Sequence, residues 1–180
     1  MQNNELMKPA GNLNCKKTSM KPNKPPTLHR IDDYQLPNEV LVGLMGDVLA
    51  RGCKFKFQAK GASMAPFIRD RDNITVNPLT QVTPSMGRVV ACTCSESQKL
   101  IVHRIVEVEN TSYLLKGDNS LAQPDGWFPK EKIIGVVTRV ERGGTQIKFG
   151  LGVERLLIAH LSKKGLLTRI INRLHGIIKR

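Results

Sequence analysis

The segment "LIVHRIVEVE", residues 100–109, decides the fold class of this 180-residue chain. Valine and isoleucine dominate the segment, and alternate side chains of an extended chain point to opposite faces, so it predicts a β-strand. Six further segments show strand signals and are separated by turn residues; they span 54–60, 73–78, 87–94, 113–118, 133–141 and 145–149. Seven short strands in about a hundred residues predict a mainly β fold with one β-rich body.

A helix is expected before this body. In "PNEVLVGLMGDVLARG", residues 37–52, apolar residues recur at helical spacing. Asn38 is expected to cap the start and Gly52 to close the end, which predicts an amphipathic helix over 38–51. Residues 1–35 hold four prolines among asparagines and lysines, with little to bury, and are expected to form a disordered basic arm.

The last segment, residues 151–180, returns to helical spacing. Lysine and arginine fill much of it, beside an apolar stripe made of Leu156, Leu157, Leu161, Leu167, Ile170, Ile171, Leu174 and Ile178. Gly165 is expected to divide the segment into two shorter helices. This basic amphipathic tail has two interpretations. It could lie on an anionic membrane surface, or it could form a helical hairpin packed on the body or on a partner protein.

The net charge of +13 is concentrated at the two ends of the chain. Residues 1–30 carry +5 and residues 151–180 carry +6, which leaves only +2 for residues 31–150. A nucleic-acid-binding core would carry its basic residues on the folded face. We therefore expect that the central body binds no nucleic acid.

The cysteines and the hydropathy pattern give expectations about the compartment. Cys15, Cys53, Cys92 and Cys94 form no CxxC pair and have no partners at zinc-ligand spacing, so we expect reduced thiols and no metal site. No stretch reaches the ~18 to 20 uninterrupted apolar residues of a spanning helix. The N-terminus lacks the apolar segment of a secretory signal peptide. The chain is expected to be cytoplasmic, or peripheral to a membrane.

One serine has a candidate base elsewhere in the chain. Ser63 lies in "GASMAP", residues 61–66, with no histidine or carboxylate within several residues. Serine is a weak nucleophile unless a base removes its proton. Of the four histidines only His103 lies within the β-rich body, on the same strand face as Ile101 and Ile105. A neutral imidazole among apolar side chains can accept a proton from a hydroxyl.

Two aspartates could orient that imidazole, as a third group does in Ser-His-Asp hydrolases. Asp118 lies in a Gly-Asp-Asn turn just after a strand, and Asp125 follows seven residues later in Pro-Asp-Gly. Both are also ordinary turn residues, and a serine after Gly-Ala is often only a turn former. Spacing and periodicity leave the structural and the catalytic interpretations open.

The order of these motifs resembles the type I signal peptidases. "GASMAP", "VHRIV", "LKGDN", "PD" and "IIGVV" follow one another over about residues 55–145, as in the archaeal and endoplasmic-reticulum branch, whose base is a histidine. The resemblance implies a signal peptidase/LexA-like β-rich peptidase fold, with 36–150 as catalytic domain and a shallow groove beside the serine. It implies Ser63 as nucleophile, His103 as general base and Asp118 as supporting acid. Asp125 would take the part of the second aspartate.

The chain departs from the signal-peptidase pattern in several respects. Gly61 stands where bacterial enzymes often carry a hydroxyl that helps to hold the oxyanion, so the hole is expected to rest on backbone N–H groups, first that of Ser63. No spanning helix of the kind that anchors signal peptidases is recognised. This departure bears on which substrate is cleaved more than on the chemistry of cleavage.

The resemblance implies a serine endopeptidase that processes a protein or precursor peptide by acyl transfer, without a metal or organic cofactor. Two alternatives stay open: a LexA-type regulator that cleaves itself, and a non-catalytic protein-binding module on the same fold. His103 at the base position, where the LexA type has a lysine, argues against the first. The joint presence of Ser63, His103 and the aspartates argues against the second.

Overall fold

The computed structural model describes residues 37–94, 99–121 and 123–178. The predicted arm, residues 1–35, lies outside the described residues, together with Cys15 and His29. The described residues form three α-helices, eight strands and one 3₁₀ helix, Lys130–Lys132. No described helix has both the length and the apolar character needed to cross a membrane.

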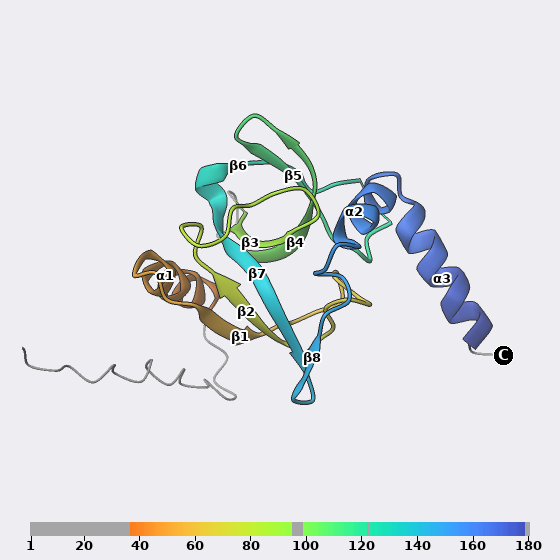
Figure 1. Cartoon of the computed structure of the whole chain (residues 1–180), viewed down its shortest axis with the longest axis horizontal. Coiled ribbons are helices and arrows are strands. Elements are labelled where there is room, and N and C mark those ends of the chain that lie inside the picture. Colours follow the sequence, from red (N-terminus) through yellow and green to blue (C-terminus); the bar gives the residue numbers. More distant parts are fainter. Residues whose placement is uncertain (1–36, 95–98, 122, 179–180) are drawn as a thin grey trace, which may run out of the picture.

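The strands pair into one antiparallel sheet, so the prediction of a mainly β fold is confirmed. Their bounds are β1 (Phe55–Gln58), β2 (Asn73–Asn77), β3 (Val89–Thr93), β4 (Leu100–Glu109), β5 (Ser112–Lys116), β6 (Gly126–Pro129), β7 (Ile133–Arg142) and β8 (Thr145–Ile147). The order is β1-β2-β7-β3-β4-β5-β6, and β8 pairs with β7 (Figure 1). The strand β6 was not predicted, because Pro124 and Gly126 at its start are residues typical of a turn.

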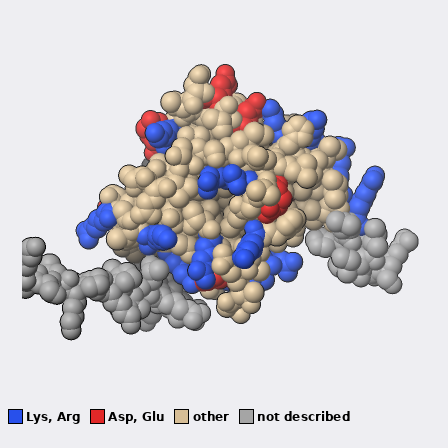
Figure 2. Space-filling model, in the orientation of Figure 1, with Lys and Arg blue, Asp and Glu red and all other residues tan. Residues whose placement is uncertain are grey.

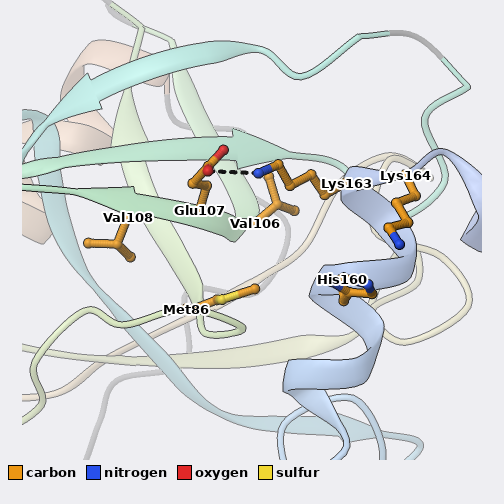
Figure 3. Close-up of a pocket in the computed structure, with 7 residues that line it drawn as sticks. All are labelled: Met86, Val106, Glu107, Val108, His160, Lys163 and Lys164. Carbon is orange, nitrogen blue, oxygen red and sulfur yellow. Dashed lines mark ion pairs between the residues drawn. The ribbon is translucent and has the colours of Figure 1, made fainter.

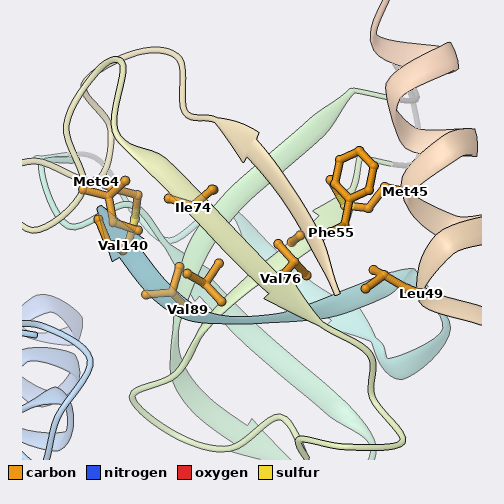
Figure 4. Close-up of a cluster of buried hydrophobic side chains, with 11 residues drawn as sticks. Met45, Leu49, Phe55, Met64, Ile74, Val76, Val89 and Val140 are labelled. Carbon is orange, nitrogen blue, oxygen red and sulfur yellow. The ribbon is translucent and has the colours of Figure 1, made fainter. Parts of the chain in front are cut away.

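The sheet separates two hydrophobic clusters, and β3 supplies both. Val89 and Ala91 belong to a first cluster, whereas Val90 and Cys92 belong to a second one on the opposite face. The first cluster contains Met45, Leu49, Phe55, Met64, Ile68, Ile74, Val76, Val89, Ala91, Val137 and Val140 (Figure 4). The second contains Val90, Cys92, Ile105, Tyr113, Leu115, Ile133 and Val136. A strand that is buried on both faces reads as a continuous apolar run, as "VVAC" does.

The helix α1 (Asn38–Ala50) contributes Met45 and Leu49 to the first cluster. Gly52 closes the helix as predicted: its N–H donates to the Leu49 carbonyl at 2.9 Å, and the Cys53 N–H donates to the Val48 carbonyl at 3.2 Å. This pair of bonds is a Schellman motif, and Gly52 takes the positive φ, 74°, that the motif requires.

The helix α1 begins at residue 38 as predicted, but the expected cap at Asn38 is wrong. Asn38 is the first helical residue, and Pro37 holds the cap position without a side-chain hydrogen bond. The Pro37 carbonyl accepts from the Leu41 N–H at 3.0 Å. The proline ring restricts φ, here −51°, and with ψ at 145° the residue has the extended conformation that a cap needs.

The tail forms α2 (Arg155–Lys163) and α3 (Leu166–Ile178), divided as expected at Gly165, whose φ is 66°. The helix α2 packs on β4, and α3 packs on α2, at the end of the sheet away from α1 (Figure 1). A third cluster, made of Phe67, Ile158, Leu167 and Ile171, joins both helices to the body. The tail therefore packs on its own body, yet Leu156 and Leu157 of the predicted stripe are exposed.

A charged pair ties the connection between β1 and β2 to β7. The Arg142 guanidinium donates from Nε and Nη2 to the two carboxylate oxygens of Asp72, at 2.8 and 2.6 Å. The Arg69 N–H donates to the same carboxylate at 2.8 Å. Burial opposes ionisation of Asp72, but the bonds from Arg142 and Arg69 outweigh it and hold the pKa of the carboxyl below its usual value.

We expect Asp72→Asn to reduce the free energy of unfolding at neutral pH by about 2 kcal/mol, because a hydrogen-bonded charged pair is lost. Because the pKa of Asp72 is lower in the folded protein than in the unfolded chain, the ionised carboxylate stabilises the fold at pH values above the unfolded pKa, about 4. This stabilisation is lost as the pH falls through the pKa of the folded state. The variant should therefore lose less stability than the wild type on acidification below about pH 4. Urea titrations at several pH values measure this, with Asp47→Asn on α1 as control. Parallel acid profiles of wild type and Asp72→Asn would contradict the assignment.

Candidate active site

The segment 59–72 between β1 and β2 carries Ser63 and is closed at its base. The Ala59 N–H donates to the Asp72 carbonyl at 2.7 Å, and the Arg71 N–H donates to the Ala59 carbonyl at 2.9 Å. Met64 and Ile68 are buried in the first cluster. Ser63 itself is exposed. The closed base of the segment and the buried anchors that follow the exposed hydroxyl give the serine a fixed position that solvent can reach.

His103 lies on β4, between β3 and β5 in the sheet, with only 14% of its side chain exposed. Its Nε2 is 3.1 Å from the Ser63 Oγ, although forty residues separate the two in the chain. This distance lies within the range of a hydrogen bond and of direct proton transfer.

Asp125 lies on the other side of the imidazole. Its Oδ2 is 2.5 Å from the His103 Nδ1, and its backbone N–H donates to the Leu115 carbonyl at 2.9 Å, just before β6. An ionised carboxylate only accepts hydrogen bonds, so the Nδ1 must carry the proton that is shared with Asp125. The neutral ring then leaves Nε2 free to accept from the Ser63 hydroxyl.

The turn after β5 holds the serine against the histidine. The Asn119 N–H donates to the Ser63 carbonyl at 2.8 Å, and the Asn119 side-chain amide donates to the Ala62 carbonyl at 3.2 Å. Gly117 lies so close that a Cβ there would be 2.9 Å from the Ser63 carbonyl oxygen and 3.2 Å from the His103 Nε2. Only a glycine allows the turn, the hydroxyl and the imidazole to meet at these distances.

Asp118, the expected supporting acid, is directed away from the imidazole and into the protein. Its two carboxylate oxygens accept from the Arg104 Nε and Nη2 at 2.8 and 2.7 Å, and both side chains are fully buried. Burial raises the pKa of the Asp118 carboxyl, and the Arg104 guanidinium opposes that rise. The structure thus gives the two aspartates different partners: Asp125 contacts His103, and Asp118 contacts Arg104.

Two residues that contribute to this arrangement were not recognised in the sequence, Arg104 and Asn119. Arg104 could have been recognised, because an arginine that is buried among valines and isoleucines on a strand needs a partner for its charge. Its Nη1 also donates to the carbonyls of Gly87 and Gly150, at 2.7 and 2.9 Å. Asn119 could not have been recognised, because its neighbours in the sequence indicate only a turn. The partner of its side-chain amide, the Ala62 carbonyl, lies far away in the sequence.

Other candidate groups lie outside this arrangement. Burial raises the pKa of the Cys92 thiol to about 12, with the nearby Asp125 charge adding to the rise, so this cysteine is no nucleophile at neutral pH. His160 lies on α2 and His175 on α3. Among the residues that the structure describes, no group of three or more His, Cys, Asp or Glu side chains could hold a metal ion.

The two aspartates are expected to respond differently to the same substitution. Asp118→Asn leaves a buried guanidinium without its counter-charge, so we expect the free energy of unfolding to fall by about 3 kcal/mol or more. Asp125→Asn removes a partly exposed partner and should cost about 1 kcal/mol. Urea denaturation at one fixed pH measures both losses. Equal losses, or a larger loss in Asp125→Asn, would contradict the separate roles.

Comparison with known families agrees with the fold. The model of the family described as Peptidase S24-like matches residues 19–138, which is two thirds of the chain and includes Ser63, His103, Asp118 and Asp125. No curated protein matches the chain. Because the match covers most of the described sheet together with the serine segment, the chain belongs to the Peptidase S24-like family.

Proposed function

We propose that the protein is a serine endopeptidase with Ser63 as nucleophile, His103 as general base and Asp125 as the group that orients the imidazole. The observation that carries this proposal is the continuous hydrogen-bonded series from the Ser63 Oγ through both ring nitrogens of His103 to the Asp125 carboxylate. A hydroxyl, an imidazole and a carboxylate in this order form the proton-transfer unit of serine hydrolases. Membership of a peptidase family supports the same reaction class.

In the proposed reaction the Ser63 Oγ attacks a peptide carbonyl carbon while the His103 Nε2 takes the hydroxyl proton. The imidazolium so formed is stabilised by Asp125, and the negative charge on the carbonyl oxygen is stabilised by backbone N–H groups, with that of Ser63 as first candidate. His103 then gives its proton to the leaving amine, and an acyl-enzyme remains on Ser63. A water molecule activated by His103 hydrolyses the ester and restores the hydroxyl.

In this proposal Asp118 and Asn119 act as positioning residues. Asp118 neutralises Arg104, which lies next to His103 on β4, and Asn119 holds the backbone of the serine segment. This differs from the expectation in which Asp118 was the supporting acid. The carboxylate within hydrogen-bond distance of the imidazole is that of Asp125.

The substrate that fits best is an extended segment of a protein or precursor peptide. The strand β1 is the last strand on its side of the described sheet, and its end at Gln58 precedes Ser63 by five residues. An extended peptide can add to such an edge through backbone hydrogen bonds, which would bring its carbonyl groups toward the serine segment. Processing of this kind, with a histidine as base, resembles that of the archaeal and endoplasmic-reticulum signal peptidases.

The proposal is tested by trapping a substrate and then cleaving it. Ser63→Ala, expressed in the native cell and recovered with its bound peptide or protein, identifies the substrate. Purified wild type should cleave that substrate, and Ser63→Ala and His103→Ala should each reduce kcat/KM by at least about a thousandfold. Asp125→Asn should lose about a hundredfold or more, because the ring loses the charged, acceptor-only carboxylate that fixes its tautomer and stabilises the imidazolium. Normal cleavage by Ser63→Ala or His103→Ala, with Asp47→Asn as the active control, would refute the mechanism.

A LexA-type regulator that cleaves itself is the second candidate, and the family match suits it as well. We favour cleavage of another chain because the base position holds His103. Intact-mass analysis of the purified protein over several days distinguishes the two. We expect the wild type to remain at 20.0 kDa. Shorter species that arise in the wild type and are absent from Ser63→Ala would favour the self-cleaving regulator instead.

A further inference from the structure

Four large apolar side chains are exposed at and just before the start of α2. They are Phe149, Val153, Leu156 and Leu157, with exposed fractions of 65, 87, 50 and 62%. The inner face of α2 is formed by Ile158, Ala159 and Ser162, so Leu156 and Leu157 lie on its outer half, and Val153 lies in the turn just before the helix. Isolated exposed apolar residues are common, but four within nine residues form a patch that requires an explanation. We refer to these four residues as the apolar patch.

The apolar patch is held in a fixed position. The Gly150 carbonyl accepts from the buried Arg104 Nη1 at 2.9 Å, and the Phe149 ring lies 5.5 Å from the ring of Phe67. The Gly150 and Gly152 N–H groups donate to the Glu154 carboxylate, at 2.7 and 3.0 Å. The patch therefore projects from a segment that is anchored to the core.

Basic residues continue the same outer half of α2 toward its end. His160, Lys163 and Lys164 border a hollow of about 500 Å³, whose floor is formed by Met86, Val106 and Val108 (Figure 3). Lys163 forms an ion pair with Glu107 at 2.7 Å. Glu107 also lines the hollow, and its charge is offset by Lys163, so that Lys164 and the apolar side chains leave a surface that suits an anionic head group attached to an apolar chain.

Along the chain segment that carries the patch the charges are almost all positive, although the Glu107 carboxylate on β4 also lines the hollow. Between residues 148 and 173 the chain carries Lys148, Arg155, Lys163, Lys164, Arg169 and Arg173, and Glu154 is the only acidic residue. The Glu154 carboxylate is bound to backbone N–H groups, including those of Gly150 and Gly152, and these bonds lower its pKa. Lysine and arginine side chains are also visible along the right-hand margin in Figure 2, the side on which Figure 1 places α2 and α3.

We propose that the apolar patch and α2 bind the surface of an anionic lipid bilayer. The apolar patch would enter the boundary between head groups and acyl chains, and Lys163 and Lys164 would contact lipid phosphates from the hollow. A nucleic acid would leave the four apolar side chains without a partner. Charge complementarity favours an anionic lipid surface, which offers both apolar depth and negative charge in one place.

Vesicle co-sedimentation of the full chain tests this proposal without reference to peptidase activity. We expect binding to phosphatidylcholine vesicles to rise as phosphatidylglycerol is added, and to fall with added salt. Leu156→Ser/Leu157→Ser and Lys163→Gln/Lys164→Gln should each weaken binding about tenfold or more, since one basic residue near an anionic surface is worth about fivefold. Val40→Ser/Leu44→Ser on α1 is the matched control, because both residues are exposed and apolar, and should change binding by less than about twofold.

Three outcomes would overturn the proposal. The first is binding that does not depend on phosphatidylglycerol. The second is equal binding of both α2 variants and the wild type, which would assign the interaction to another part of the chain. The third is that the wild type does not bind vesicles but elutes as a dimer in size-exclusion chromatography, and that Leu156→Ser/Leu157→Ser elutes as a monomer. The apolar patch would then be a contact between two copies of the chain. Thermal unfolding of each variant verifies that the fold is retained.

Discussion

The buried ion pair between Arg104 and Asp118 is the constraint on which the site depends. An unpaired guanidinium in a protein interior costs several kcal/mol, so Arg104 dictates where its acceptors must lie. Its donors bind the Asp118 carboxylate and the carbonyls of Gly87 and Gly150, and thereby join β4 to the turn after β5, the segment before β3 and the segment before α2. His103 is the neighbouring residue on the strand. The charge buried on one side of β4 thus fixes the backbone from which the imidazole extends on the other side.

From this anchor the remaining contacts of the site follow in order. The turn that Asp118 holds also places Gly117 beside the imidazole and Asn119 on the Ser63 carbonyl. The Asp72–Arg142 pair holds the other end of the serine segment against β7. Ser63 is therefore restrained from two directions by ion pairs that do not contact it. On our account this restraint is what allows an exposed hydroxyl to remain within proton-transfer distance of His103.

Local sequence was enough to predict most of the fold, whereas Ser63 and His103 were singled out by the resemblance to a peptidase family. Strand segments follow from β-branched residues between turns, and Ser63 and His103 follow from the order of the motifs. The roles of Asp118 and Asp125 could not be separated in this way, because both lie in turns and their partners are set by long-range packing. His103 and Arg104 are adjacent and point to opposite faces of β4, and their acceptors come from two different turns. The strand β6 was missed for a similar reason, since its pairing with β5 decides its conformation.

The helical tail shows how one periodic pattern can serve two surfaces. Its apolar residues were expected either to pack on protein or to lie on a membrane. In the described helices some of them are buried and others are exposed. Ile158, Leu167 and Ile171 pack with Phe67, while Leu156 and Leu157 remain outside. Hydrophobic periodicity predicts that a helix has an apolar face, but what that face contacts depends on how the helix packs.

The most direct measurement of the central claim is the ¹⁵N NMR spectrum of the His103 ring in the wild type and in Ser63→Ala. The account predicts that the neutral ring carries its proton on Nδ1, where Asp125 accepts it, and that Nε2 is unprotonated. The Nε2 resonance should shift when the Ser63 hydroxyl is removed, because that nitrogen loses its hydrogen-bond donor. A ring protonated on Nε2, or an Nε2 resonance that Ser63→Ala leaves unchanged, would contradict the account.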